Sequence, residues 1–149
     1  MNKAKTSVRP LANTDYSSWR ALWDGYITFY EAVVPEDVTA LTWARLHDPM
    51  MPLHGWVAQM DGKVIGLTHA HEHLSTWSSA PYVYLEDLFV DPTVRKSGAG
   101  SALVEAVYAH AKNIGSPKVY WQTAYGNATA RKLYDQIGVD SGFMVYQQR

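Results

Sequence analysis

The chain has 149 residues, of which 47% are hydrophobic and 18% are charged, and its formal net charge is −1. This length and composition fit one globular domain, residues 1–149, with room for a core of two layers. The charge argues against a protein that binds nucleic acid by broad phosphate neutralisation, and the absence of cysteine excludes disulfides, thiolate zinc sites and a cysteine-linked covalent intermediate.

The N-terminal residues give no sign of export or membrane attachment. Residues 1–10 are polar and lack the apolar stretch of a signal peptide, and no apolar run approaches the ~20 residues that a membrane span needs. The lack of cysteine is compatible with the cytosol. We therefore expect a cytoplasmic protein without a membrane partner.

Apolar periodicity predicts two helices and three strands in the first half of the chain. In order, these are a strand at Thr6–Pro10, a helix that carries Trp19, Leu22, Trp23, Tyr26 and Phe29, a helix after Pro35, and strands at His54–Met60 and Lys63–His73. Asp61-Gly62, between the last two strands, is a strong hairpin-turn dipeptide.

The second half alternates strands and helices. The expected elements are a loop at Leu74–Ala80, a strand at Tyr82–Val90, a helix that ends near Gly115, a strand at Lys118–Thr123, a helix from Asn127 to about Gln136, and a last strand at Phe143–Gln147. Together with the first half, this order indicates one mixed α/β domain.

A basic, glycine-bearing turn, Arg95-Lys-Ser-Gly-Ala-Gly100, joins the strand at Tyr82–Val90 to the helix that follows. Backbone N–H groups at a helix start have no partners of their own, and the helix dipole makes that end an anion site. Gly98 and Gly100 let a ligand approach the backbone, and Arg95 and Lys96 add positive charge. The turn therefore predicts a phosphate site, against the plainer alternative of a turn with a solvated Arg-Lys pair.

Two common nucleotide motifs do not match this turn. A Walker loop ends in Gly-Lys-Ser/Thr, whereas this turn reads Gly-Ala-Gly-Ser. A dinucleotide fingerprint needs Gly or Ala where Leu103 stands, and an acidic residue about 20 positions further on, where the chain has Tyr120-Trp-Gln122. What remains is Arg-x-x-Gly-x-Gly after a strand, a turn suited to a pyrophosphate.

Three segments resemble the GCN5-related N-acetyltransferase (GNAT) superfamily: the strand Leu85-Glu-Asp-Leu-Phe-Val90, the turn Arg95–Gly100, and Asn127-x-x-Ala130-x-x-Leu133-Tyr134. The resemblance covers essentially the whole chain and is closest to the branch of polyamine and histone-type amine acetyltransferases. It implies an α/β fold with a mixed, mostly antiparallel sheet that contains one splayed parallel strand pair and is flanked by helices. Lys96-Ser97 departs from the family, which commonly has glycine after the arginine.

The resemblance also implies a binding site for acetyl-CoA between the strands Tyr82–Val90 and Lys118–Thr123. The residues expected to bind it are Leu88, Phe89 and Val90 along the pantetheine arm, Arg95, Lys96, Ser97, Gly98, Ala99 and Gly100 around the pyrophosphate, and Asn127 near the pantetheine or the acetyl end.

Two residues carry the expected chemistry. An alkylammonium, whose pKa is near 10.4, must lose a proton before it attacks a thioester, and a carboxylate in a partly apolar cleft is a suitable base. Glu86 matches the family position for this base; a structural, paired carboxylate is the alternative. Tyr134 matches the tyrosine that donates a proton to the leaving thiolate, and a core tyrosine is the alternative there. Strand alternation predicts that Glu86 and Asp87 point to opposite faces.

The acceptor side is less well defined. Tyr26, Tyr30 and Trp77 are candidate cleft walls, because aromatic faces attract alkylammonium groups, but core or interface packing explains them equally well. His71 is a candidate beside Glu86. Although His69, His71 and His73 share one face of a strand, they spread over roughly 13 Å, too far for one metal ion, so no metal is expected.

The sequence thus predicts an acetyl-CoA-dependent N-acetyltransferase that acts on a primary amine, such as a polyamine, a lysine side chain or another small amine, by direct attack in a ternary complex. The alternatives are a non-catalytic acyl-CoA-binding sensor or interaction domain, and an acyltransferase for an amino-acid or aminoglycoside amine. A homodimer is the family's common state and is the expected assembly.

Overall fold

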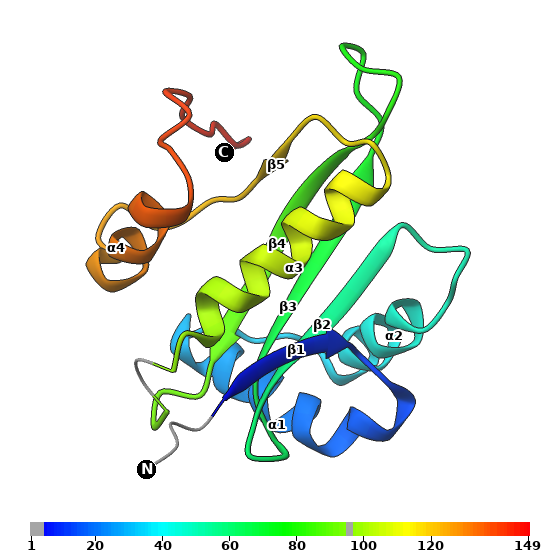
Figure 1. Cartoon of the computed structure of the whole chain (residues 1–149), viewed down its shortest axis with the longest axis vertical. Coiled ribbons are helices and arrows are strands. Elements are labelled where there is room, and N and C mark those ends of the chain that lie inside the picture. Colours follow the sequence, from blue (N-terminus) through cyan, green and yellow to red (C-terminus); the bar gives the residue numbers. More distant parts are fainter. Residues whose placement is uncertain (1–4, 95–96) are drawn as a thin grey trace.

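The computed structural model describes residues 5–94 and 97–149 (Figure 1). Its strands and helices are β1 (Thr6–Pro10), α1 (Tyr16–Phe29), α2 (Glu36–Leu46), β2 (Leu53–Met60), β3 (Lys63–His73), β4 (Tyr82–Val90), α3 (Ala99–Asn113), β5 (Val119–Tyr120) and α4 (Ala128–Ile137), with a 3₁₀ turn at Asn13–Asp15. Within these ranges, no helix combines the length and the apolar character needed to cross a membrane.

The strands form one five-stranded sheet in the order β1-β2-β3-β4-β5, in which only β4 and β5 run parallel. Asp61 and Gly62, at the β2–β3 turn, both have positive φ (53° and 76°), as a two-residue type I′ hairpin requires. The mixed α/β fold and the hairpin predicted from the sequence are thereby confirmed.

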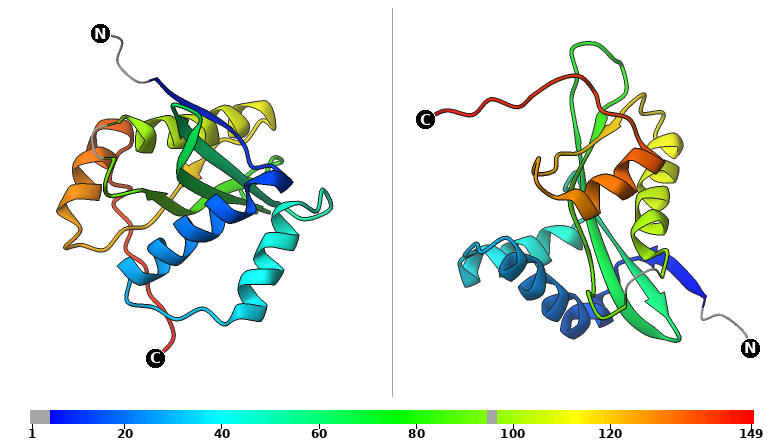
Figure 2. Two further views of the ribbon diagram at one scale, coloured as in Figure 1. Left: turned by 90° about the horizontal axis from the view of Figure 1, so that it is seen from below. Right: turned by 90° about the vertical axis from the view of Figure 1, so that its left-hand side faces the viewer.

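Helices cover both faces of the sheet (Figure 2). On one face α3 packs Leu103, Val104 and Val107 into a cluster that includes Ile65 and Leu85 of the sheet. On the other face, beside α2, α1 buries its aromatic stripe. That second cluster consists of Trp19, Leu22, Trp23 and Leu67, with Trp43 of α2 and Phe89 of β4 packed against it. The sheet therefore has an α3 face and an α1 face, two terms used below.

The parallel pair separates after its first two rungs. β5 pairs with β4 only at Val83↔Val119 and Tyr84↔Tyr120. From Leu85 to Val90, β4 has no neighbouring strand on that side in the described part of the chain, whereas its other edge stays paired with β3 as far as Val90. The strand predicted at Lys118–Thr123 is shorter than expected for this reason. The divergence opens one backbone edge of β4.

The strand predicted at Phe143–Gln147 is wrong for this chain. No strand is assigned there, and Phe143 and Tyr146 are 84% and 88% exposed. After α4 the segment runs away from the sheet (Figure 2, red). An extended segment becomes a strand only when a neighbour takes up its backbone hydrogen bonds, and no strand among the described residues pairs with this segment.

Candidate active site

A β-bulge in β4 places two acidic side chains on the same face of the sheet. The β3–β4 register shifts between His69↔Asp87 and Ala70↔Leu85, so that Glu86 is the extra residue on β4. The side chains of Glu86 and Asp87 consequently both meet histidines of β3 on the α1 face. The prediction that they point to opposite faces is wrong, because the alternation of a regular strand is interrupted at a bulge.

Asp87 belongs to a buried hydrogen-bonded chain. Its carboxylate lies 2.9 Å from Nδ1 of His69, and Nε2 of His69 accepts a hydrogen bond of 3.0 Å from the indole N–H of Trp19. Because Nε2 accepts, the ring proton resides on Nδ1 and is donated to Asp87. The backbone carbonyl of Asp87 also accepts a 2.7 Å hydrogen bond from Thr68. These hydrogen bonds hold both the side chain and the backbone of Asp87 in place at the bulge.

Glu86 and His71 form a second, more accessible pair. Nε2 of His71 lies 3.0 Å from the Glu86 carboxylate, and their side chains are 37% and 50% exposed. The hydrogen bond to Glu86 raises the pKa of His71 above 6.5 against the opposing effect of burial, with the charges of Glu86 and Asp87 as smaller causes. The prediction that His71 lies beside Glu86 is confirmed.

Tyr26 and Tyr30 lie over this region from α1 and its C-terminus. Their rings meet edge to face at 5.2 Å, and Tyr26 also contacts Phe89 at 6.0 Å. Burial, followed by the charge and hydrogen bonding of Asp87, raises the pKa of Tyr26. The two tyrosines thus form a continuous aromatic surface beside the acidic bulge. Trp77, the third wall candidate, lies instead in the β3–β4 loop, 90% exposed.

Tyr134 lies on α4, which the side chain of Asn127 caps by accepting a hydrogen bond of 3.2 Å from the N–H of Ala130. The helix predicted to start at Asn127 is confirmed. Burial raises the pKa of Tyr134 to about 12, with the charge of Tyr30 as a second, smaller cause. Trp121 flanks the ring at 5.5 Å. A phenol with this pKa keeps its proton at neutral pH and can donate it.

The glycine turn begins α3 as expected, although its two glycines serve different purposes. Gly98 is the N-cap, with φ of 77°, and a Cβ there would meet nothing within 4 Å. Its backbone is therefore open to a ligand. A Cβ on Gly100 would lie 3.0 Å from Cδ2 of Leu133, so this glycine instead allows α3 and α4 to pack closely.

The residues on either side of Gly98 hold the turn in place through burial and hydrogen bonds. Ala99 is buried, the Ser97 hydroxyl accepts a 3.3 Å hydrogen bond from the Ala99 N–H, and the Ser97 carbonyl accepts one of 2.9 Å from Thr6. The positions predicted for Arg95 and Lys96 lie outside the described residues.

The backbone positions predicted to hold the cofactor arm lie on the open edge. Leu88, Phe89 and Val90 all fall within the part of β4 that faces no strand on the β5 side. Their side chains go elsewhere, because Leu88 and Val90 pack on the α3 face and Phe89 on the α1 face. Only the backbone of these residues lies along the open edge.

A hollow of about 790 Å³ adjoins this region without containing it. It lies between α1 and the adjoining ends of β3 and β4, and its lining includes Gly25, Phe29 and Phe89 but none of Glu86, Asp87 and Tyr134. We therefore base the candidate site on the bulge, the open edge of β4 and the start of α3.

Sequence reasoning missed the roles of Asp87, His69 and Trp19. His69 and Asp87 were visible in the sequence, but only the register of β3 against β4 brings them together. His73 pairs with neither carboxylate; its Nε2 lies 2.7 Å from the hydroxyl of Tyr120. The three alternating histidines thus have three different partners.

Comparison with known proteins shows which family the chain belongs to. A profile of the acetyltransferase (GNAT) family matches residues 19–139. The D-amino-acid N-acetyltransferase HPA3 of Saccharomyces cerevisiae (strain ATCC 204508 / S288c) is 34% identical over 143 residues, which cover 95% of this chain and 89% of that protein. The aminoglycoside N(6')-acetyltransferase type 1 of Salmonella typhimurium is 27% identical, with 89% and 90% covered.

Among solved structures, the aminoglycoside N-acetyltransferase AAC(6')-Iy in complex with CoA superposes with a TM-score of 0.82. The match covers 99% of this chain and 96% of that chain at 24% identity, which establishes a shared fold. The family profile spans most of the chain, and the fold carries the splayed parallel pair. The chain therefore belongs to the acetyltransferase (GNAT) family and is an N-acetyltransferase.

Proposed function

We propose that residues 1–149 form a single N-acetyltransferase domain that transfers the acetyl group of acetyl-CoA directly to the primary amine of a small molecule. The observation that carries this proposal is the bulge in β4. It sets the Glu86–His71 pair on one face of the strand whose backbone edge is open from Leu85 to Val90. An acyl donor held along that edge would lie next to a base.

The cofactor site proposed here has two parts. The open edge at Leu88–Val90 offers backbone groups to the amides of the pantetheine arm, and the first N–H groups of α3, behind Gly98, face the pyrophosphate. The complex of a related fold with CoA supports this choice of cofactor.

Glu86 is the proposed base, directly or through a water molecule, and His71 is its partner. The amine loses a proton to Glu86, and its nitrogen attacks the thioester carbonyl carbon. Because His71 is bonded to Glu86 and is itself partly exposed, it can pass the proton on to solvent. The C–S bond then breaks, and Tyr134 supplies the proton that converts the thiolate leaving group to a thiol. The second proton that the nitrogen loses as the amide forms returns to Tyr134 through solvent. With no cysteine in the chain, a covalent acyl-cysteine intermediate is excluded.

The acceptor proposed first is an amino-acid or aminoglycoside amine, because proteins named for these substrates match the chain over most of its length. A polyamine or a lysine side chain is the second candidate. One observation weighs against a polycationic acceptor: the carboxylate of Glu36, in the first turn of α2, is already paired with Arg20 through two contacts of 2.6 Å.

A thiol-release assay with acetyl-CoA tests this proposal against a panel of D- and L-amino acids, aminoglycosides, polyamines and lysine peptides. We expect release to depend on at least one small amine and to fall by ~10²-fold or more in Glu86→Gln. If acetyl-CoA binds but no amine stimulates release, the chain is an acyl-CoA sensor instead.

A further inference from the structure

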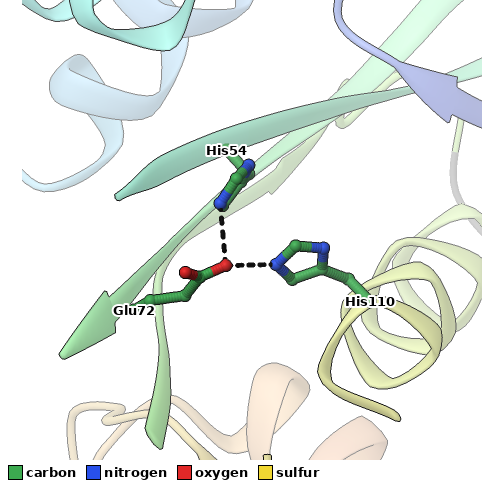
Figure 3. A group of neighbouring side chains, drawn as sticks. All are labelled: His54, Glu72 and His110. Carbon is green, nitrogen blue, oxygen red and sulfur yellow. Dashed lines mark hydrogen bonds and ion pairs between the residues drawn. The ribbon is translucent and has the colours of Figure 1, made fainter. Parts of the chain in front are cut away.

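Three metal-ligating side chains meet on the α3 face of the sheet, away from the candidate active site. His54 lies at the start of β2, Glu72 near the end of β3 and His110 in the last turn of α3 (Figure 3). Glu72 is adjacent in sequence to His71, and strand alternation therefore places the two side chains on opposite faces. The group belongs to neither the bulge nor the glycine turn.

Each imidazole points its Nε2 atom at the same carboxylate oxygen of Glu72. Nε2 of His54 lies 2.9 Å, and Nε2 of His110 2.7 Å, from Oε1 of Glu72. The three atoms all lie within 4.8 Å of one another. Ligands bound tetrahedrally to zinc at ~2.1 Å stand about 3.4 Å apart, so shifts of less than about 1 Å would convert this group into a metal site.

The surroundings suit a metal ion with one open position. Trp56 is buried and lies 5.4 Å from the His110 ring, which gives the group an apolar wall. The side chains of His54, Glu72 and His110 are 36%, 23% and 20% exposed, leaving access for a water molecule as fourth ligand.

We propose that His54, Glu72 and His110 bind a divalent transition-metal ion of the zinc class, which fastens the C-terminal end of α3 to the ends of β2 and β3. Two imidazoles and one carboxylate are a ligand set that zinc accepts. The sequence predicted no metal, because His69, His71 and His73, which share one face of a strand, lie too far apart along it to bind one ion. These ligands come from three elements, and their residue numbers carry no motif spacing.

The test uses untagged full-length protein, stripped with a chelator, dialysed and titrated with Zn²⁺ in a calorimeter and with Co²⁺ in a spectrophotometer. We expect one ion per chain and visible absorption bands typical of Co²⁺ with a low coordination number. We also expect a higher melting temperature when Zn²⁺ is present. If the chain takes up no stoichiometric ion, or if Zn²⁺ leaves the melting temperature unchanged, the group is a hydrogen-bonded triad only and the proposal fails.

Two variants, Glu72→Gln and His110→Gln, test whether the group is a metal site or only a hydrogen-bonded triad. In Glu72→Gln the amide oxygen still accepts from both imidazoles, so a hydrogen-bonded triad survives, but a neutral amide is a poor zinc ligand. We expect Glu72→Gln and His110→Gln each to weaken Zn²⁺ binding more than about 100-fold, since even outer-shell partners of metal sites cost ~10–100-fold. His73→Gln, next in β3 but bonded to Tyr120, is the histidine control and should bind like the parent. Equal Zn²⁺ affinity in Glu72→Gln and the parent would overturn the assignment.

Discussion

At the scale of residues, the candidate site depends on two His–carboxylate pairs in different environments. The His69–Asp87 pair is buried and tied to Trp19, whereas the His71–Glu86 pair is partly exposed. The first pair holds the bulge in place, and the second is accessible to an amine. This difference in accessibility is why we assign the proton transfer to Glu86 and a positioning role to Asp87.

The raised pKa of His71 can be tested by NMR titration. We expect the pKa to lie above 6.5 in the parent and to fall in Glu86→Gln, where burial is left as the main influence. Because the pKa of His71 is raised in the folded protein, its protonated form stabilises the fold. This contribution to stability is fully present below about pH 6.5 and is lost as pH rises through the raised pKa. A His71 titration that is the same in both proteins would rule out the pairing.

Tyr134 should matter for turnover rather than for cofactor affinity. Tyr134→Phe removes only the hydroxyl, and we expect kcat to fall ~10²-fold while the Kd for acetyl-CoA, measured by calorimetry, stays near that of the parent. Tyr108→Phe is the matched control. Its hydroxyl donates a 2.7 Å hydrogen bond to the carbonyl of Ile137 at the end of α4, so its loss should cost about 1 kcal/mol of stability and leave kcat unchanged. Equal losses of kcat and cofactor affinity in Tyr134→Phe would indicate a packing role.

At the scale of elements, local signals in the sequence predicted what they control directly. Asp61-Gly62 predicted the β2–β3 hairpin, and Asn127 predicted the start of α4. The bulge at Glu86 was not predictable in this way, since it depends on how β4 aligns with β3. The same holds for the divergence of β5 from β4, which shortened one predicted strand.

Gly98 allows a direct test of the cofactor site. Gly98→Glu should place a side chain and a negative charge where the pyrophosphate is expected, and calorimetry should show a loss of acetyl-CoA binding. Gly115→Glu is the control at the opposite end of α3. Its φ of 74° is nearly the same, and a Cβ there also meets nothing within 4 Å, so the backbone strain is matched. Binding of acetyl-CoA by Gly98→Glu as by the parent would refute the assignment of this turn.

At the scale of the whole molecule, the segment after α4 is where the prediction from the sequence failed, because the expected strand does not form. Phe143, Val145 and Tyr146 are 84%, 66% and 88% exposed, and this β-prone stretch has no strand neighbour among the described residues. The sequence could signal the strand propensity, but pairing requires an edge to pair with.

We expect the protein to be a homodimer in which a second copy covers these exposed side chains. Light scattering after size-exclusion chromatography should give about twice the chain mass of 16.7 kDa. Truncation after residue 141 should shift the protein toward monomer. A monomeric parent at all concentrations tested would contradict this expectation.

The central claim is direct transfer of acetyl from acetyl-CoA to a small amine. It is tested most directly by mass spectrometry of a reaction that contains the enzyme, acetyl-CoA and the best acceptor from the panel. The account predicts an N-acetylated amine that forms in step with free CoA, with no acetyl group left on the protein. Release of CoA without an acetylated amine, or an acetylated enzyme that passes its acetyl group on, would contradict it.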